Sequence, residues 1–394
     1  MRAREPVRTG LERLVSGDAG AHLRGPSLGL VLHPASVTAE LFLSVDVLVE
    51  AGFEIRVLFG PQHGARGEKQ DNMIESADYT DPRSGVPVYS LYSDVRKPTA
   101  AMLEGLDAVL FDLQDVGVRV YTFIWTMALC MEACAEAGVR FVVLDRPNPV
   151  GGVDREGPIL RPGFASFVGM HPIPLRHGMT AGELARWLSE ARGIGCELEV
   201  VPMTGWARDM LWEDTGLPYV LPSPNLPTPE SCLVYPGMVL LEGTNLSEGR
   251  GTTRPFELVG APYLDPHALV GECDPDAWEG ASLRPCWFEP TFQKHRGAVC
   301  GGMQIHVTEP RSFRPVRGAV ELLRVARALA PESFRWRPPP YEYEELLMPI
   351  DMLWGHDGLR TGIDRGASLA EILEGVEEDC RVFTESVEPH LLYG

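Results

Sequence analysis

Hydrophobic residues in the first half of the chain alternate between short continuous apolar runs and stretches with helical spacing. Such runs are typical of strands buried on both faces, whereas apolar residues three or four apart indicate helices packed on one side. We predict strands at residues 28–32, 54–59, 106–113, 140–145 and 197–203, and helices at 38–50, 122–137 and 180–191. This alternation predicts an α/β fold with a mostly parallel sheet covered on both faces.

Two of these helices begin with recognisable capping residues. Thr38 is the predicted N-cap of the helix at 38–50. Thr180, with Glu183 three residues later, predicts a capping box, in which the two side chains satisfy each other's backbone N–H groups.

The alternation weakens from about Pro255, where Trp, Pro and Phe become frequent. A strand at 302–308 and a helix at 315–330 are the clearest elements of this part. A chain of 394 residues is also too long for one ordinary core. We therefore predict a sheet domain at residues 1–245 and a smaller α+β domain at 246–394 that completes a cleft.

Composition narrows the choice of partners and compartment. The chain has 35 basic and 55 acidic residues, a formal net charge of −20, which disfavours binding to nucleic acid or to an anionic membrane. Its eight cysteines are scattered without a CxxC pair, as in proteins of a reducing compartment. No apolar run is long enough to span a membrane, and no leader-like segment follows Met1, so we expect a cytoplasmic protein. The patterns leave the oligomeric state open.

Three polar loops follow predicted strands, at residues 60–64, 114–119 and 146–149. In open α/β sheets, ligands bind outside the carboxyl ends of the strands, so these loops are expected to share one edge. Dinucleotide and phosphate-loop fingerprints are absent, as are the HExxH and GxSxG motifs. We therefore expect no nucleotide cofactor and no metal, and the pattern disfavours a serine hydrolase.

The richest cluster of polar residues is the loop at 241–256. It carries Glu242, Asn245, Glu248 and Arg250 among several hydroxyls and glycines. Sugars require such mixed donors and acceptors, and a carboxylate pair can divide acid and base duties in glycosidic cleavage. The alternative is an ordinary solvated loop.

Other candidates lie in the strand-end loops. Arg119, with Tyr121 nearby, could bind a substrate carboxylate, and Asp115 is either an acid, a base or the salt-bridge partner of Arg119. Pro147 and Pro149, which follow Arg146 and Asn148, would hold these two side chains in place, for binding or simply as a turn. His63 and His177 are either proton carriers or structural hydrogen-bonding residues.

Several of these segments together resemble the NamZ-type exo-β-N-acetylmuramidase family. The matching runs are 111–119, 144–149, 177–184, 222–228 (which adds Asn225) and 242–256, and the likeness extends from about Leu28 to Tyr393. The resemblance implies removal of N-acetylmuramic acid from the non-reducing end of peptidoglycan fragments. It also implies a Rossmann-like domain beside a smaller one, a site in the cleft between them, a muramic-acid-containing sugar or muropeptide as partner, and no cofactor.

One position departs from the family pattern. The family has Pro-Glu-His-Gly, and its Glu is the leading candidate for the catalytic carboxylate, whereas this chain has Gln62 between Pro61 and His63. An amide cannot donate a proton as a general acid. Gln62 could instead orient the substrate's 2-acetamido group, which can act as the nucleophile, while Glu242, Glu248 or Asp115 handles the proton.

Two interpretations follow from this departure. The first is an active glycosidase, in which Arg119 or Arg146 binds the lactyl carboxylate that distinguishes muramic acid from N-acetylglucosamine. The second is a catalytically impaired homologue that binds or senses glycan, and Gln62 is the residue that favours it.

Overall fold

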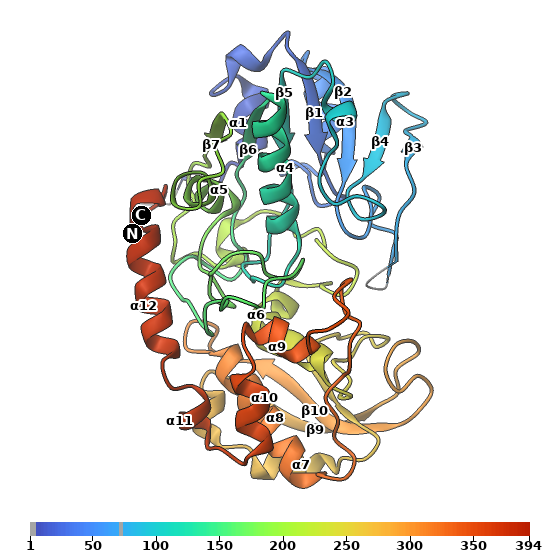
Figure 1. Cartoon of the computed structure of the whole chain (residues 1–394), viewed down its shortest axis with the longest axis vertical. Coiled ribbons are helices and arrows are strands. Elements are labelled where there is room, and N and C mark those ends of the chain that lie inside the picture. Colours follow the sequence, from blue (N-terminus) through green and yellow to red (C-terminus); the bar gives the residue numbers. More distant parts are fainter. Residues whose placement is uncertain (1–4, 71–73) are drawn as a thin grey trace.

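The computed structural model describes residues 5–70 and 74–394, so the predicted absence of a leader at residues 1–4 lies outside the described residues. A seven-stranded sheet forms the centre of the first lobe, with the strand order β3-β4-β2-β1-β5-β6-β7 (Figure 1). The strands are β1 (Ser27–Val31), β2 (Glu54–Gly60), β3 (Tyr79–Thr80), β4 (Pro87–Ser90), β5 (Ala108–Phe111), β6 (Arg140–Leu144) and β7 (Leu198–Val201). All neighbouring strands run parallel except the β3–β4 pair at the edge.

Helices cover both faces of this sheet because its strands present apolar side chains on both. Leu28 and Leu110 pack into the core under α1 (Gly10–Ser16) and α2 (Ser44–Glu50). Val109 and Phe111, on the opposite face of β5 (Ala108–Phe111), pack under the second helical layer. That layer consists of α3 (Ala100–Leu103), α4 (Phe123–Ala137) and α5 (Ala181–Ala191). Strands β2, β4 and β3 lie on one side of β1, and β5, β6 and β7 lie on the other. The strand order reverses between β1 and β5, which is the topological switch point of the sheet.

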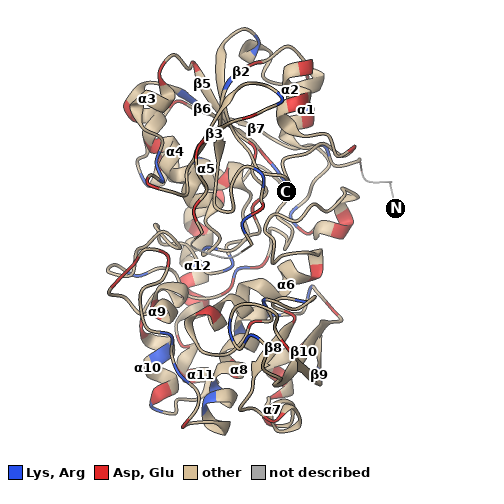
Figure 2. Ribbon diagram, turned by 90° about the vertical axis from the view of Figure 1, so that its right-hand side faces the viewer, with Lys and Arg blue, Asp and Glu red and all other residues tan. Residues whose placement is uncertain are grey.

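The second lobe contains a three-stranded antiparallel sheet with the order β8-β10-β9. Its strands are β8 (Leu258–Ala261), β9 (Ala281–Phe288) and β10 (Cys300–Val307). Its helices are α6 (Pro229–Met238), α7 (Pro266–Glu272), α8 (Pro315–Leu329), α9 (Pro349–Trp354), α10 (Gly358–Asp364) and α11 (Leu369–Ile372). The short 3₁₀ turns of the described chain, taken over both lobes, are η1 (Ala21–Leu23), η2 (Trp212–Thr215), η3 (Val239–Gly243), η4 (Pro275–Trp278) and η5 (Glu388–His390). Acidic residues are spread over both lobes (Figure 2).

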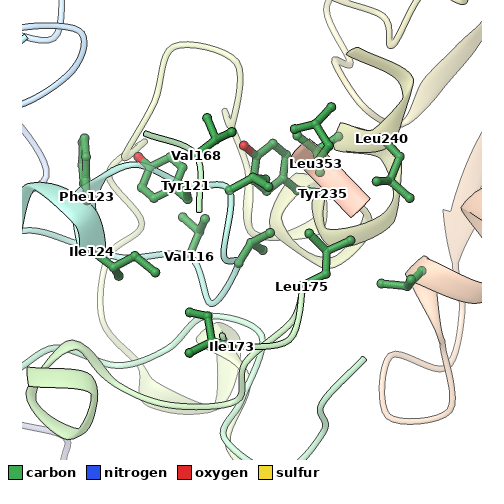
Figure 3. Close-up of a cluster of buried hydrophobic side chains, with 14 of the residues drawn as sticks. Val116, Tyr121, Phe123, Ile124, Val168, Ile173, Leu175, Tyr235, Leu240 and Leu353 are labelled. Carbon is green, nitrogen blue, oxygen red and sulfur yellow. The ribbon is translucent and has the colours of Figure 1, made fainter. Parts of the chain in front are cut away.

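The two lobes are joined by apolar packing and by the end of the chain. Val116 and Tyr121 of the first lobe lie in one buried cluster with Tyr235 and Leu353 of the second (Figure 3). Helix α12 (Val376–Val387) runs along the side of the molecule from the second lobe back to the first (Figure 1). The last residues then dock on the first lobe, where the Tyr393 hydroxyl donates to Asp145 at 2.5 Å.

The structure confirms the predicted α/β class with a smaller second unit, and each predicted strand of the first half is present. The capping box of Thr180 and Glu183 is also present. The helix predicted from Thr38 is wrong in its start, because α2 begins only at Ser44. Thr38 instead belongs to a tight turn in which its N–H donates to the carbonyl of Phe42. Helix α6 precedes the predicted domain break, yet it packs against α8 of the second lobe.

Candidate active site

A small, partly open cavity of about 30 Å³ lies at the carboxyl ends of β2 and β5, where the second lobe covers the sheet edge. It is lined by Gln62, His63, Val120, Tyr121, Thr122, Val168, Ser223, Leu226, Tyr235, Glu242, Arg250, Phe256, Tyr341 and Glu342. This volume corresponds to about one water molecule. A sugar therefore enters only when part of the wall moves.

Gln62 lies at the centre of a hydrogen-bond network on the first-lobe side of the cavity. Its Oε1 accepts a 2.6 Å bond from the Thr122 hydroxyl. Its Nε2 faces the opposite way and donates to the Tyr92 hydroxyl at 3.1 Å and to Oε1 of Glu342 at 3.2 Å. Both ends of the amide are therefore engaged, and its orientation is fixed.

Glu342 enters the cavity from the second lobe, and only 3% of it is exposed. Besides the amide of Gln62, its carboxyl accepts a 2.6 Å hydrogen bond from the Tyr92 hydroxyl to Oε2. Burial raises the pKa of Glu342 to about 7; the Tyr92 hydrogen bond opposes this rise, and the charge of Glu242 adds to it. Glu342 is therefore a carboxyl that can hold a proton near neutral pH.

Glu242 is a second buried carboxyl in the same cavity, with a different environment. It accepts a 2.7 Å hydrogen bond from Nη2 of Arg250 and another of 2.7 Å from the Tyr341 hydroxyl. Burial acts to raise the pKa of Glu242, but the Arg250 guanidinium and these hydrogen bonds hold it below its usual range. Glu242 is accordingly the ionised carboxylate of the pair.

Arg250 retains binding capacity after these contacts are made. Its Nε lies 3.3 Å from Glu248, and its guanidinium stands 5.2 Å from the ring centre of Phe256. Nη1 is buried and has no hydrogen-bond partner within the described part of the chain. A guanidinium that lines a cavity with an unused donor is suited to an anionic ligand.

His63 and Tyr121 complete the first-lobe wall. Nδ1 of His63 lies 2.7 Å from the carbonyl of Lys69, so this nitrogen carries a proton, and Nε2 lies 3.3 Å from the Ser223 hydroxyl. The Tyr121 hydroxyl donates to the carbonyl of Pro222 at 2.6 Å. Sequence analysis singled out both residues, and the structure places both at the cavity together with Gln62, Glu242 and Arg250.

Asp115, His177 and Asn148 form a separate buried group beside the cavity. Oδ2 of Asp115 lies 3.3 Å from Nε2 of His177 and accepts the N–H of Gly117. Gly117 has a φ of 78°, and a Cβ there would meet Oδ1 of Asn148 at 2.4 Å. Asn148 in turn donates to the carbonyl of Met179 at 3.0 Å. These contacts hold the strand-end loops together.

The two arginines predicted to bind the lactyl carboxylate have structural contacts instead. Arg119 is fully buried and donates to the backbone carbonyls of Pro158, Ile173 and Leu353 at 2.7–2.9 Å. Arg146 forms a bidentate pair with Asp112 at 2.7 and 2.9 Å. Neither lines the cavity, and in the described residues Asp115 faces His177 and is not the salt-bridge partner of Arg119. Both guanidinium groups are buried and donate to nearby protein oxygens, although Nε of Arg119 has no partner among the described residues.

Glu248, Asn245 and Asn225 also lie outside the cavity lining. Glu248 is paired with Lys294 at 2.8 Å and supports Arg250 from behind. The side chain of Asn245 is bound by Tyr263 and the backbone around residues 333–335. Asn225 exchanges hydrogen bonds with Gln70.

Sequence reasoning missed six lining or supporting residues: Tyr92, Thr122, Ser223, Tyr235, Tyr341 and Glu342. The stretch Tyr341-Glu342-Tyr343-Glu344 reads as a solvated acidic segment. Its one distinctive signal is the alternation of tyrosine and glutamate directly after three prolines. That pattern is compatible with a stiff segment that presents polar side chains, but it does not identify a partner.

Over residues 5–70 and 74–394, no group of three or more His, Cys, Asp or Glu side chains is arranged to hold a metal ion. In the same described part of the chain, no helix is both long and apolar enough to cross a bilayer.

Comparisons with known proteins cover the whole chain. Family models described as the N-terminal and C-terminal parts of exo-beta-N-acetylmuramidase NamZ match residues 28–230 and 233–393. The peptidoglycan beta-N-acetylmuramidase NamZ of Bacillus subtilis is 44% identical over 393 residues, 99% of this chain and 92% of that protein. Two crystal structures of DUF1343 family proteins from Bacteroides fragilis are also similar. One has a TM-score of 0.88 at 31% identity and covers 100% of both chains, and the other has 0.76 at 28% and covers 99% of both.

Proposed function

This chain belongs to the exo-β-N-acetylmuramidase NamZ family, and from that membership we propose that it hydrolyses peptidoglycan fragments, releasing N-acetylmuramic acid from their non-reducing ends. The substrate is a muramic-acid-containing sugar or muropeptide. The full-length similarity to a peptidoglycan β-N-acetylmuramidase supports the reaction type, and the cavity supplies the chemistry.

Two buried carboxyls, those of Glu242 and Glu342, line the same small cavity, and this pair carries the proposal. Burial raises the pKa of Glu342 to about 7, whereas Arg250 holds the pKa of Glu242 below its usual range despite burial. Glycosidic cleavage uses two carboxyls in different protonation states, one as acid and the other as base or as a stabiliser of positive charge. Environments that push two pKa values apart produce that division.

Arg250 is the side chain that best fits recognition of the lactyl carboxylate. It lines the cavity, carries a full positive charge and has Nη1 without a protein partner in the described residues. Arg119 and Arg146 use their donors on backbone carbonyls and on Asp112. A charge-assisted hydrogen bond is worth roughly 1.5–3 kcal/mol, so its loss should cost tenfold or more in affinity.

The test is turnover of a chromogenic aryl β-N-acetylmuramide, with the corresponding N-acetylglucosaminide as the discriminating substrate. We expect release of the aryl alcohol from the muramide and at least tenfold less from the glucosaminide. Arg250→Lys should reduce this preference, whereas Arg254→Lys, on the same loop but partly exposed, serves as the matched control. A protein that binds the muramide without releasing the aryl alcohol would contradict the proposed hydrolysis.

We propose two domains, residues 1–245 and 246–394, supported by the separate sheets of the two lobes. Helix α6 belongs to the first of these by sequence and packs against α8 of the second. We also propose a cytoplasmic role in cell-wall recycling, supported by eight cysteines that are all free thiols.

A further inference from the structure

We propose that Glu342 is the general acid of this enzyme, and that Gln62 and Tyr92 are positioning residues that hold its carboxyl toward the glycosidic oxygen. The proposal rests on the muramidase function proposed above. It resolves the difficulty raised by position 62, where the chain has an amide that cannot donate a proton. The proton then comes from the carboxyl that this amide contacts at 3.2 Å.

The hydrogen-bond directions support this assignment. Because the Thr122 hydroxyl donates to Oε1 of Gln62, the Nε2 of that amide must face Tyr92 and Glu342. Tyr92 accepts from Gln62 and donates to Oε2 of Glu342 at 2.6 Å. One oxygen of the carboxyl is thus bound by the amide and the other by the phenol, which fixes the plane of the group.

The backbone at Glu342 points to the same conclusion. Tyr341 and Glu344 exchange two backbone hydrogen bonds of 2.9 Å across a tight turn, with Glu342 and Tyr343 between them. These two residues have φ values of 47° and 67°, a conformation favoured for Gly, Asn and Asp. Holding non-glycine residues there costs about 1 kcal/mol or more each. Strain at a buried carboxyl that lines a cavity is expected where the position of the side chain matters.

The other carboxylates named by sequence analysis are less suitable as acids. Glu242 is held ionised by Arg250, and Glu248 is paired with Lys294 and Arg250 outside the cavity lining. Asp115 faces His177 and does not line the cavity. Glu342, in contrast, lines the cavity and accepts hydrogen bonds from two neutral groups, Gln62 and Tyr92.

The charged and titratable groups around Glu342 favour a proton near neutral pH. Burial is the largest influence and raises its pKa to about 7. The negative charge of Glu242 acts in the same direction, while Tyr92, Gln62 and the more distant Arg96 act against it. Tyr235 and Tyr341 nearby stay neutral, because burial raises the pKa of both phenols well above the usual value.

Glu342 transfers its carboxyl proton to the glycosidic oxygen while the bond between the anomeric carbon and that oxygen breaks. The electron pair of the broken bond stays on the leaving oxygen, which departs as an alcohol. Water adds its hydroxyl to the anomeric carbon, and its remaining proton restores the protonated form of Glu342. Ionised Glu242 stabilises the positive charge that develops on the sugar.

The experiment compares Glu342→Gln with the wild type on two substrates. One is a natural muramyl disaccharide, whose sugar alcohol must be protonated as it leaves. The other is an aryl muramide with an acidic phenol, which leaves without protonation. General acid assistance is worth about 10²–10⁴-fold. We expect a loss of that size on the disaccharide, a loss of less than tenfold on the aryl substrate, and disappearance of the alkaline limb near pH 7.

The ratio of the two rates is measured on one preparation, so it does not depend on the folded fraction. Glu345→Gln, an exposed neighbour on the same segment, is the matched control and should keep the wild-type ratio. An active wild type with equal losses on both substrates in Glu342→Gln overturns the role of Glu342 alone. A wild type that cleaves neither substrate overturns the proposed function, and the role of Glu342 with it.

Discussion

Replacing Gln62 by glutamate restores the carboxyl of the family pattern, and we expect it to raise muramidase activity, above all at alkaline pH. Nε2 of Gln62 lies 3.2 Å from Glu342, so the variant has two carboxyls in contact. Two like charges about 4 Å apart repel by about 4 kcal/mol at an effective dielectric constant of about 20. This energy corresponds to roughly 3 pKa units, so the pair should keep one proton well above pH 7.

The size of the gain follows from the protonated fraction. With a pKa of about 7, Glu342 keeps its proton in about one wild-type molecule in a hundred at pH 9. The variant should remain protonated there and be up to about 100-fold faster. Near pH 5 both proteins carry the proton, and the gain should fall below about tenfold. Initial rates on a muramyl disaccharide from pH 5 to 9 measure this difference.

Gln70→Glu, the same change at an exposed position farther along the loop, is the control and should leave the pH profile in place. Two results would refute the reasoning. An unchanged alkaline limb in Gln62→Glu would mean that Glu342 is not the titrating acid. A uniform loss of activity at every pH would mean that the amide itself is required, as in orienting the substrate's acetamido group.

Three further changes test neighbouring parts of the argument. Tyr92→Phe removes a hydrogen bond that lowers the pKa of Glu342, so the alkaline limb of the rate profile should move upward; a downward shift would contradict this. Glu342→Gln should raise the free energy of unfolding at pH 8 by up to roughly 3 kcal/mol. The reason is that burial raises the pKa of Glu342 in the folded protein, so the wild type loses stability as the pH rises from the unfolded pKa of this carboxyl to its folded pKa. Denaturant unfolding should show no such gain below about pH 4.5. Arg119→Met leaves three buried carbonyls without a donor and should cost roughly 3–5 kcal/mol of stability in urea unfolding, with the muramide preference unchanged in the folded protein.

The alternation of apolar runs was enough to predict the sheet, because strands buried on both faces leave a local pattern. The strand-end rule also brought Gln62, His63 and Tyr121 to one edge, and the cavity lies there. The strands β3, at the edge of the sheet, and β4, beside it, were missed because two and four residues are too few to show a clear alternation.

The remaining site residues depend on contacts that local patterns do not contain. Glu342 meets Gln62 across 280 positions of chain, and an acidic stretch gives no sign of being buried. The opposite case is that of Arg119 and Arg146, whose place in polar loops suggested ligand binding and whose guanidinium groups contact protein oxygens in the structure. Only the fold shows which oxygens already occupy a guanidinium.

Arg119 has a consequence for how substrate reaches the site. Its guanidinium donates to the carbonyls of Pro158 and Ile173 in the first lobe and of Leu353 in the second. Arg119 therefore holds the two lobes together at the centre of the molecule. Helix α12 and Tyr393 add a second fastening at the rim. Two lobes that are joined at two separate places resist a hinge motion that would separate them. Substrate entry then depends on the movement of a short segment of the cavity wall. The turn that carries Glu342 is such a segment, because it combines a strained backbone with an exposed side chain, Tyr343. Glu342 would then reach its position only when this turn closes over the bound sugar, which couples proton transfer to enclosure of the sugar.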